Sequence, residues 1–214
     1  MPDNRTALIL GATGLVGSFL LQRLLASASY DRVMAWARRD IARKDPKLAV
    51  EIVDFGRLHE RRAEAEDVYC CLGTTIKQAG SQVAFRRVDY DYPVALAIAA
   101  AAGGAKRLLV VSALGANPDS TVFYNRVKGE MEEAVRAAGV PATIFFRPSL
   151  LVGPRERVRT GERVGMLIGN LLGPLLGRYR PIGADLVASA MLKVAEQDMQ
   201  VQIVENNRIR EIGL

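Results

Sequence analysis

The sequence predicts an α/β fold built on a doubly wound parallel sheet, folded as a single domain over residues 1–214. Two observations support this prediction. Short apolar runs alternate with helical stretches along the whole chain, and such repetition implies right-handed crossover connections between parallel strands. Most of the runs are continuously apolar rather than alternately apolar and polar, which is typical of strands that are covered on both faces.

The expected strands are the apolar runs, and the turn and helix signals that separate them define seven. They are Ala7–Leu10, Val33–Ala37, Val50–Val53, Val68–Cys71, Leu108–Ser112, Thr143–Phe146 and Val201–Val204.

Three helices are expected between these strands. Leu15–Ala26 follows a glycine-rich turn, and Pro93–Ala102 begins with proline at a position that tolerates it and stops before two glycines. Thr121–Ala138 carries apolar residues at helical spacing and ends at a glycine. The charged tract Glu60–Glu66 is expected to form a short helix on the surface.

One segment departs from this alternation. Residues 152–181 are rich in Gly, Pro and Arg, and we expect them to form a small insertion on the substrate side of the domain. The apolar stretch Met166–Leu176 within it could close over a pocket, pack on the core or offer a docking surface. Arg155, Arg157 and Arg159 could attract an anionic substrate or be simply solvated.

Composition limits the classes of function. No apolar run reaches the roughly 20 residues that span a bilayer, and no signal peptide is visible, so no stable membrane insertion is expected. Cys70 and Cys71 are adjacent and suit neither a disulfide nor a metal site, so reduced cytoplasm is the expected compartment. The net charge of +6 is expected to keep the protein soluble rather than to bind a particular partner. Nucleic acid is not an expected partner, because no basic run is interleaved with stacking aromatic residues.

The glycine-rich turn carries the first functional signal. It reads Gly11-Ala-Thr-Gly14-Leu-Val-Gly17 and joins an expected strand to an expected helix. The backbone N–H groups and the helix N-terminus at such a turn can hold a pyrophosphate, so a dinucleotide is expected here. The alternative is an ordinary turn that uses glycine for packing. The residues expected to contact the dinucleotide are Gly11, Thr13, Gly14, Leu15, Val16 and Gly17.

The end of the second strand indicates which dinucleotide. NAD enzymes usually place an acidic residue there to hold the ribose 2′-hydroxyl, whereas this chain reads Trp36-Ala37-Arg38-Arg39. Guanidinium donors suit the 2′-phosphate of NADP(H), which is therefore the expected cofactor, with Arg38 as the first choice of ligand. The alternative is two surface arginines. Asp54, after the third strand, could contact the adenine or serve as a turn residue.

The second functional signal lies more than a hundred residues after the first. Tyr124 and Lys128 stand four residues apart and share one face of the expected helix. A lysine ammonium beside a phenol lowers the phenol pKa from about 10, which makes the tyrosine a usable acid or base near neutral pH. Ser112 ends the fifth strand, at the sheet edge where parallel sheets hold ligands, and can bond a substrate carbonyl.

At this point the chain resembles the atypical short-chain dehydrogenases/reductases, and among them the Tat-interacting-protein-like oxidoreductases. The matching stretches are spread over most of the chain. They are Gly11–Gly17, Cys70-Cys-Leu-Gly-Thr-Thr75, Arg87-Val-Asp-Tyr-Asp91, Val111-Ser-Ala-Leu-Gly-Ala116, Tyr124–Glu130 and Arg147-Pro-Ser-Leu-Leu-Val-Gly-Pro154.

The resemblance implies a Rossmann sheet that binds NADP(H) and transfers hydride to or from a small carbonyl or alcohol substrate. It assigns carbonyl polarisation to Ser112, the acid/base role to Tyr124, and the holding of both Tyr124 and the nicotinamide ribose to Lys128. It also implies that Leu72 and Gly73 pass close to the adenosine ribose, and that residues from Pro148 to Leu151 flank the nicotinamide.

One residue departs from the family pattern. Many members place Asn after the fourth strand to anchor a water in a proton relay, and here the comparable position is Asp89. A carboxylate could hold the same water, yet it would add negative charge beside a phenolate.

The sequence alone is compatible with two functions. The first is the NADP(H)-dependent oxidoreductase, which is favoured because both Tyr124 and Lys128 are present. The second is an NADP(H)-binding sensor or assembly factor without turnover, whose protein partner would dock on the leucines of the insertion, Leu171, Leu172, Leu175 and Leu176. A homodimer through two long helices is common in the wider family.

Overall fold

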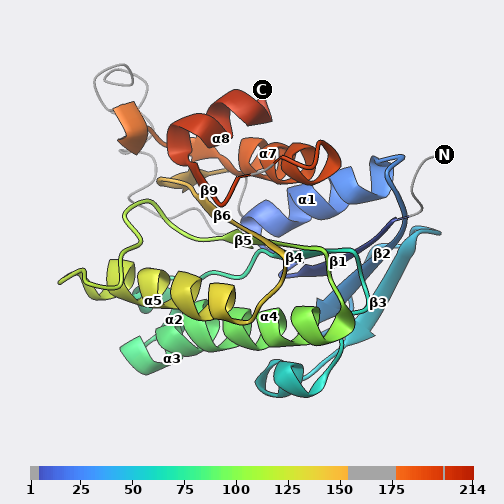
Figure 1. Ribbon diagram of the computed structural model, residues 1–214, viewed down its shortest axis with the longest axis horizontal. Helices are drawn as coiled ribbons and strands as arrows, with labels where there is room; N and C mark the ends of the chain where they lie inside the picture. The colour runs from blue at the N-terminus through green and yellow to red at the C-terminus, as the bar shows by residue number, and fades with distance from the viewer. Residues whose placement is uncertain (1–4, 154–176, 200) are drawn as a thin grey trace.

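The computed structural model describes residues 5–153, 177–199 and 201–214. Its centre is a seven-stranded sheet in the order β3-β2-β1-β4-β5-β6-β9, and each of its strand pairs is parallel (Figure 1). The doubly wound α/β fold is therefore confirmed. The strands are β1 (Arg5–Leu10), β2 (Tyr30–Ala37), β3 (Leu48–Ile52), β4 (Asp67–Cys70), β5 (Arg107–Val111), β6 (Ala142–Arg147) and β9 (Ile203–Glu205).

Helices cover both faces of the sheet, as Figure 1 shows. On one face lie α1 (Leu15–Ala26), α7 (Ala184–Glu196) and α8 (Asn206–Gly213). On the other lie α4 (Tyr92–Gly103) and α5 (Phe123–Ala137), preceded by the short α2 (Ile76–Ala79) and α3 (Gln82–Arg86). The three expected helices are thus present as α1, α4 and α5, and their first and last residues are close to those predicted.

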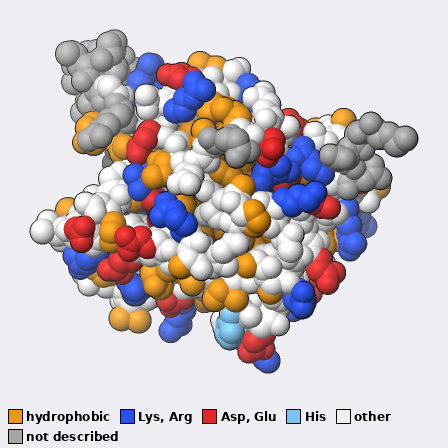
Figure 2. Space-filling model, in the orientation of Figure 1, with side chains coloured by type: hydrophobic (Ala, Val, Ile, Leu, Met, Phe, Trp, Pro, Cys, Tyr) orange, Lys and Arg blue, Asp and Glu red, His pale blue; other side chains and the backbone are white. Residues whose placement is uncertain are grey.

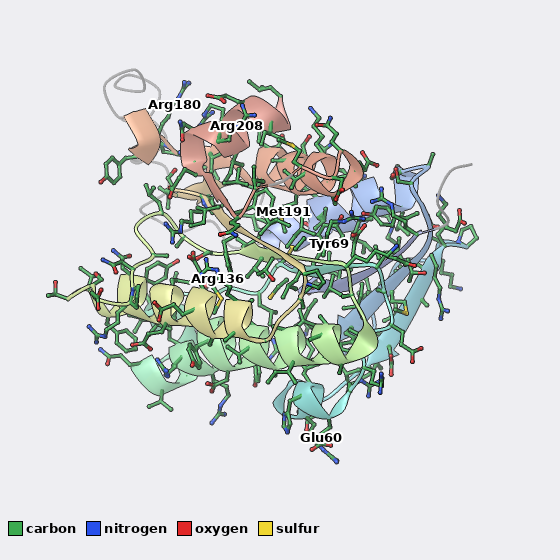
Figure 3. The ribbon with its side chains drawn as sticks, viewed as in Figure 1. Glu60, Tyr69, Arg136, Arg180, Met191 and Arg208 are labelled. Carbon is green, nitrogen blue, oxygen red and sulfur yellow. The ribbon has the colours of Figure 1, made fainter. Side chains whose placement is uncertain are left out.

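Two hydrophobic cores result, because successive side chains of a strand point to opposite faces. In β1, Ala7 and Ile9 pack under α1 and α7, whereas Leu8 and Leu10 pack toward α4. Tyr69 of β4 and Met191 of α7 belong to the first of these cores (Figure 3). Burial of both faces explains why the strands read as continuous apolar runs.

A buried polar cluster joins the strands at their amino ends. The fully buried Asp67 carboxylate accepts hydrogen bonds from the Tyr30 hydroxyl at 2.6 Å and from Arg107 Nε at 2.5 Å. Arg5 Nη1 lies 3.3 Å from the same carboxylate, and the Tyr69 hydroxyl lies 2.8 Å from that of Tyr30. This cluster connects β1, β2, β4 and β5 at the edge of the sheet opposite the glycine-rich turn.

The predicted helix over Glu60–Glu66 is wrong. A 3₁₀ turn, η1 (Phe55–Glu60), ends where that helix was expected to begin, and Glu60 lies at its outer end (Figure 3). The following residues form neither helix nor strand, and in them Ala63 and Ala65 are buried on either side of the exposed Glu64. The Ala63 N–H donates to the Ala99 carbonyl at 2.9 Å, so the tract is fixed against α4 rather than solvated as a helix.

The structure describes only the two ends of the expected insertion. β7 (Leu151–Val152) and β8 (Ile182–Gly183) form a small parallel pair, and η3 (Gly177–Tyr179) precedes β8. The apolar stretch Met166–Leu176, which contains the four leucines of the expected docking surface, and the three arginines of residues 155–159 lie outside the described residues.

The surface carries both signs of charge, and Figure 2 shows basic and acidic side chains mixed over most of the face in view. Within the described ranges, no helix is long and apolar enough to cross a bilayer.

Candidate active site

A cavity of about 1030 Å³ lies at the carboxyl ends of the strands. The sheet order reverses between β1 and β4, and open parallel sheets bind ligands at such a switch point. The cavity brings together many of the predicted site residues from five separate segments of the chain. These are Thr13, Gly14, Leu15, Val16, Leu72, Gly73, Ser112, Tyr124, Lys128, Pro148 and Leu151.

The glycine-rich turn forms one wall of the cavity. Gly11 has φ of +91°, and a Cβ there would lie 2.8 Å from the Cys71 carbonyl carbon. A Cβ on Gly17 would overlap the Gly11 carbonyl oxygen, so only glycine lets α1 lie this close to the turn. Gly14 is the N-cap of α1 and has no side chain to occupy the first helical N–H groups. The turn therefore fits a pyrophosphate, because these donors and the helix dipole face the cavity.

The two arginines after β2 are placed differently. Arg39 lines the cavity, whereas the Arg38 guanidinium lies 5.7 Å from the centre of the Phe55 ring, in a cation–π contact. The sequence offers both arginines and ranks Arg38 first, whereas the structure places Arg39 in the lining of the cavity.

Asp54 has the structural role that the sequence left open. Its Oδ1 accepts a hydrogen bond from the Gly56 N–H at 2.8 Å and so caps η1. A contact between Asp54 and adenine stays a prediction.

Tyr124 and Lys128 project from α5 into the cavity. Asp89, from the helical segment between α3 and α4, lines the same cavity. Asp89 Oδ1 lies 2.8 Å from Lys128 Nζ, and both side chains are buried. The other carboxylate oxygen accepts the Thr74 N–H at 2.9 Å. Asp89 stands in a π turn, η2 (Arg87–Asp91), that interrupts the helical path from α3 to α4. Such turns often mark functional sites.

The electrostatics of Tyr124 differ from the sequence prediction. Burial raises the pKa of Tyr124, Lys128 lowers it and Asp89 raises it further, so the net direction is upward. Lys128 does lower the pKa of Tyr124, as expected from the sequence, but burial is the largest influence and together with Asp89 it outweighs the ammonium, so the expected net lowering is wrong. Burial alone would lower the pKa of Lys128, but its pairing with Asp89 raises it.

Ser112 has a partner that sequence reasoning missed. Its Oγ donates to Glu132 Oε1 at 2.5 Å, and Arg147 Nη2 lies 2.6 Å from the other oxygen of the same carboxylate. Glu132 is buried and follows Tyr124 and Lys128 at the next four-residue step of α5. The sequence held a signal for this residue, because Glu132 is acidic and lies on the helix face that Tyr124 and Lys128 share.

The chain matches the NAD(P)H-binding family model over residues 11–198. HTATIP2 of Rattus norvegicus is 33% identical over 219 residues, which cover 99% of this chain and 90% of that protein. FMP52-1 of Scheffersomyces stipitis, named as mitochondrial, is 35% identical over 156 residues, covering 71% of this chain and 69% of the relative.

Similar folds occur among solved structures of low sequence identity. MoeE5 in complex with UDP-glucose and NAD superposes with a TM-score of 0.68 at 17% identity, covering 97% of this chain and 80% of that one. Bordetella bronchiseptica WbmH in complex with NAD⁺ has a TM-score of 0.72 at 14% identity, with 95% and 75% covered.

The relatives contradict the predicted cytoplasmic location. Those from Scheffersomyces stipitis, Debaryomyces hansenii, Eremothecium gossypii and Candida albicans are all named as mitochondrial proteins. The prediction rests on two thiols that do not pair, and unpaired thiols do not distinguish one reducing compartment from another.

The family match, the near full-length similarity to HTATIP2 and the shared Rossmann-type fold agree with one another. The chain therefore belongs to the NAD(P)H-binding family, as an atypical short-chain dehydrogenase/reductase similar to HTATIP2.

Proposed function

We propose that the protein is an NADP(H)-dependent oxidoreductase that transfers hydride to or from a small carbonyl or alcohol. The observation that carries this proposal is the convergence of Ser112, Tyr124 and Lys128 on the cavity that the glycine-rich turn also lines. Arg39 in the same lining supports NADP(H) over NAD(H), because a guanidinium suits a 2′-phosphate.

The chain's own groups have distinct roles in this proposal. The N-terminus of α1 binds the pyrophosphate, and Lys128 orients the nicotinamide ribose. Tyr124 exchanges a proton with the substrate oxygen, and Ser112, whose hydroxyl hydrogen is held by Glu132, can accept a hydrogen bond from the alcohol at that place. The bound nicotinamide supplies or accepts the hydride.

Turnover by the purified protein tests the proposal. The screen follows NADPH absorbance with aldehydes, ketones and quinones, and it includes UDP-sugars because MoeE5 was solved with UDP-glucose. Tyr124→Phe is the matched control, since it removes the hydroxyl but keeps the ring that packs 5.3 Å from the Phe85 ring. We expect that variant to lose about 10²- to 10⁴-fold in rate. Equal rates for variant and parent on every active substrate would disprove the role of Tyr124.

A second candidate function is an NADP(H)-binding sensor without turnover. One observation favours it: Lys128 and Ser112 are both engaged by carboxylates of the chain itself, Asp89 and Glu132. A stable protein partner that NADPH releases, together with no turnover in the screen, would favour the sensor.

A further inference from the structure

We propose that Asp89 is a positioning residue that neutralises Lys128 and thereby keeps Tyr124 protonated at neutral pH, so that the site is set to donate a proton to a carbonyl. This inference rests on the proposed oxidoreductase function and names the form in which Tyr124 works.

The first step of the argument is geometric. Asp89 is fully buried, with one oxygen 2.8 Å from Lys128 Nζ and the other held by the Thr74 N–H at 2.9 Å. Phe85, in the same helical segment, packs its ring 5.3 Å from the Tyr124 ring. The carboxylate is therefore held at a fixed place beside Lys128, and its charge acts on the Tyr124 phenol.

The second step concerns the charges that face Tyr124. Lys128 contributes one positive charge from α5, and Asp89 contributes one negative charge from the π turn. Among the neighbouring elements, the end of β5 presents the neutral Ser112. Cys70 of β4 acts on Lys128 rather than on Tyr124, and burial raises the pKa of its thiol to about 11, so it too is neutral. Glu132, further along α5, is paired with Arg147.

These charges sum to zero around the phenol. An unpaired ammonium would favour phenolate, whereas an ion pair does so far less. Burial then decides the balance and disfavours the charged phenolate, in agreement with the raised pKa of Tyr124.

The third step is chemical. In reduction, hydride from NADPH forms the new C–H bond at the carbonyl carbon, and the carbonyl π pair moves to oxygen. That oxygen takes the Tyr124 proton, which solvent replaces, so that carbonyl, NADPH and one proton give alcohol and NADP⁺. Reduction thus starts from the protonated enzyme, while alcohol oxidation needs phenolate, which is scarce at neutral pH.

The test is a phenolate absorbance titration, which requires no turnover. The chain has six tyrosines, so the signal of Tyr124 is the difference between a protein and its Tyr124→Phe derivative. In the parent we expect a Tyr124 pKa above 10. Asp89→Asn keeps an oxygen for the Thr74 N–H but removes the charge, and we expect it to lower the Tyr124 pKa by at least about one pH unit. Asp91→Asn, an exposed carboxylate in the same π turn, is the matched control and should change nothing.

Two results would overturn the proposal. One is a Tyr124 pKa at or below 10 in the unaltered protein, which decides the matter even if Asp89→Asn does not fold. The other is the same Tyr124 pKa in Asp89→Asn and parent. If the protein turns over, the pKa on the alkaline side of its pH–rate profile for carbonyl reduction must be lower in Asp89→Asn than in the parent, as in the titration. A titration shift without turnover on any substrate upholds the Asp89 role and counts against the oxidoreductase proposal.

Discussion

Replacement of Arg39 by alanine tests the choice between NADP(H) and NAD(H). Arg39 lines the cavity just beyond the end of β2, where the 2′-phosphate of a dinucleotide on the glycine-rich turn would lie. The exposed Arg39 side chain is free to reach a phosphate without leaving a buried partner behind. The loss of binding in Arg39→Ala should therefore fall on NADPH and spare NADH.

The size of this loss follows from the exposure of the guanidinium. A hydrogen bond to a charged group contributes about 1.5–3 kcal/mol, and solvent screening puts an exposed one at the lower end. Since about 1.4 kcal/mol is a factor of ten, we expect the NADPH Kd to rise about tenfold and the NADH Kd by less than about twofold. Arg38→Ala should give a smaller difference, because its guanidinium is engaged by Phe55.

The assay uses the only tryptophan of the chain. Trp36 is buried in β2, three residues before Arg39, and its emission can be quenched by energy transfer to a bound reduced nicotinamide. Titrations at low and high salt should show the NADPH preference of the parent shrinking as salt rises. Equal fold losses for NADPH and NADH in both arginine variants would refute the assignment of the 2′-phosphate to this end of the sheet.

Two further predictions concern the framework. Gly17→Ala places a Cβ against the Gly11 carbonyl oxygen, so we expect the free energy of unfolding to fall by about 1–3 kcal/mol and NADPH binding to weaken, whereas Ser18→Ala should stay within about 0.5 kcal/mol of the parent in urea unfolding. Burial raises the pKa values of Tyr30 and Tyr69, so their phenols ionise in the unfolded chain first, and the free energy of unfolding should fall above about pH 10, by up to about 1.4 kcal/mol per pH unit for each phenol. Tyr30→Phe should make that slope shallower, and an unchanged slope would show that Tyr30 already ionises normally in the folded protein.

Much of the fold is readable in the sequence because it depends on local signals. The strands are buried on both faces, so their apolar runs stand out, and Gly17 is required by a contact within the first strand–turn–helix unit. The tract after Glu60 was misread because its charges suggest a solvated helix. Its conformation is set by Ala63 and Ala65, which bury against a distant part of the chain.

The sequence predicts which residues line the candidate site, but it does not predict which of their side chains pair with one another. Its members come from the ends of several strands, and parallel topology alone brings them to one edge. The pairs Asp89–Lys128 and Ser112–Glu132 depend on side-chain positions that spacing does not give. For Asp89 the cause is specific, since the π turn adds a residue to the helical path and changes which side chains face the cavity.

These pairs also decide which group can give a proton to a substrate. The Lys128 ammonium has three N–H donors and forms an ion pair with Asp89, so it can bind a ribose hydroxyl without breaking a buried pair whose loss would cost about 3–5 kcal/mol. Ser112 has one donor, and Glu132 holds it, so toward the cavity Ser112 offers lone pairs. Those lone pairs can accept from an alcohol but cannot polarise a carbonyl. In the proposed carbonyl reduction, the hydrogen bond and the proton would then both come from Tyr124, which requires the phenol to be protonated when the substrate arrives.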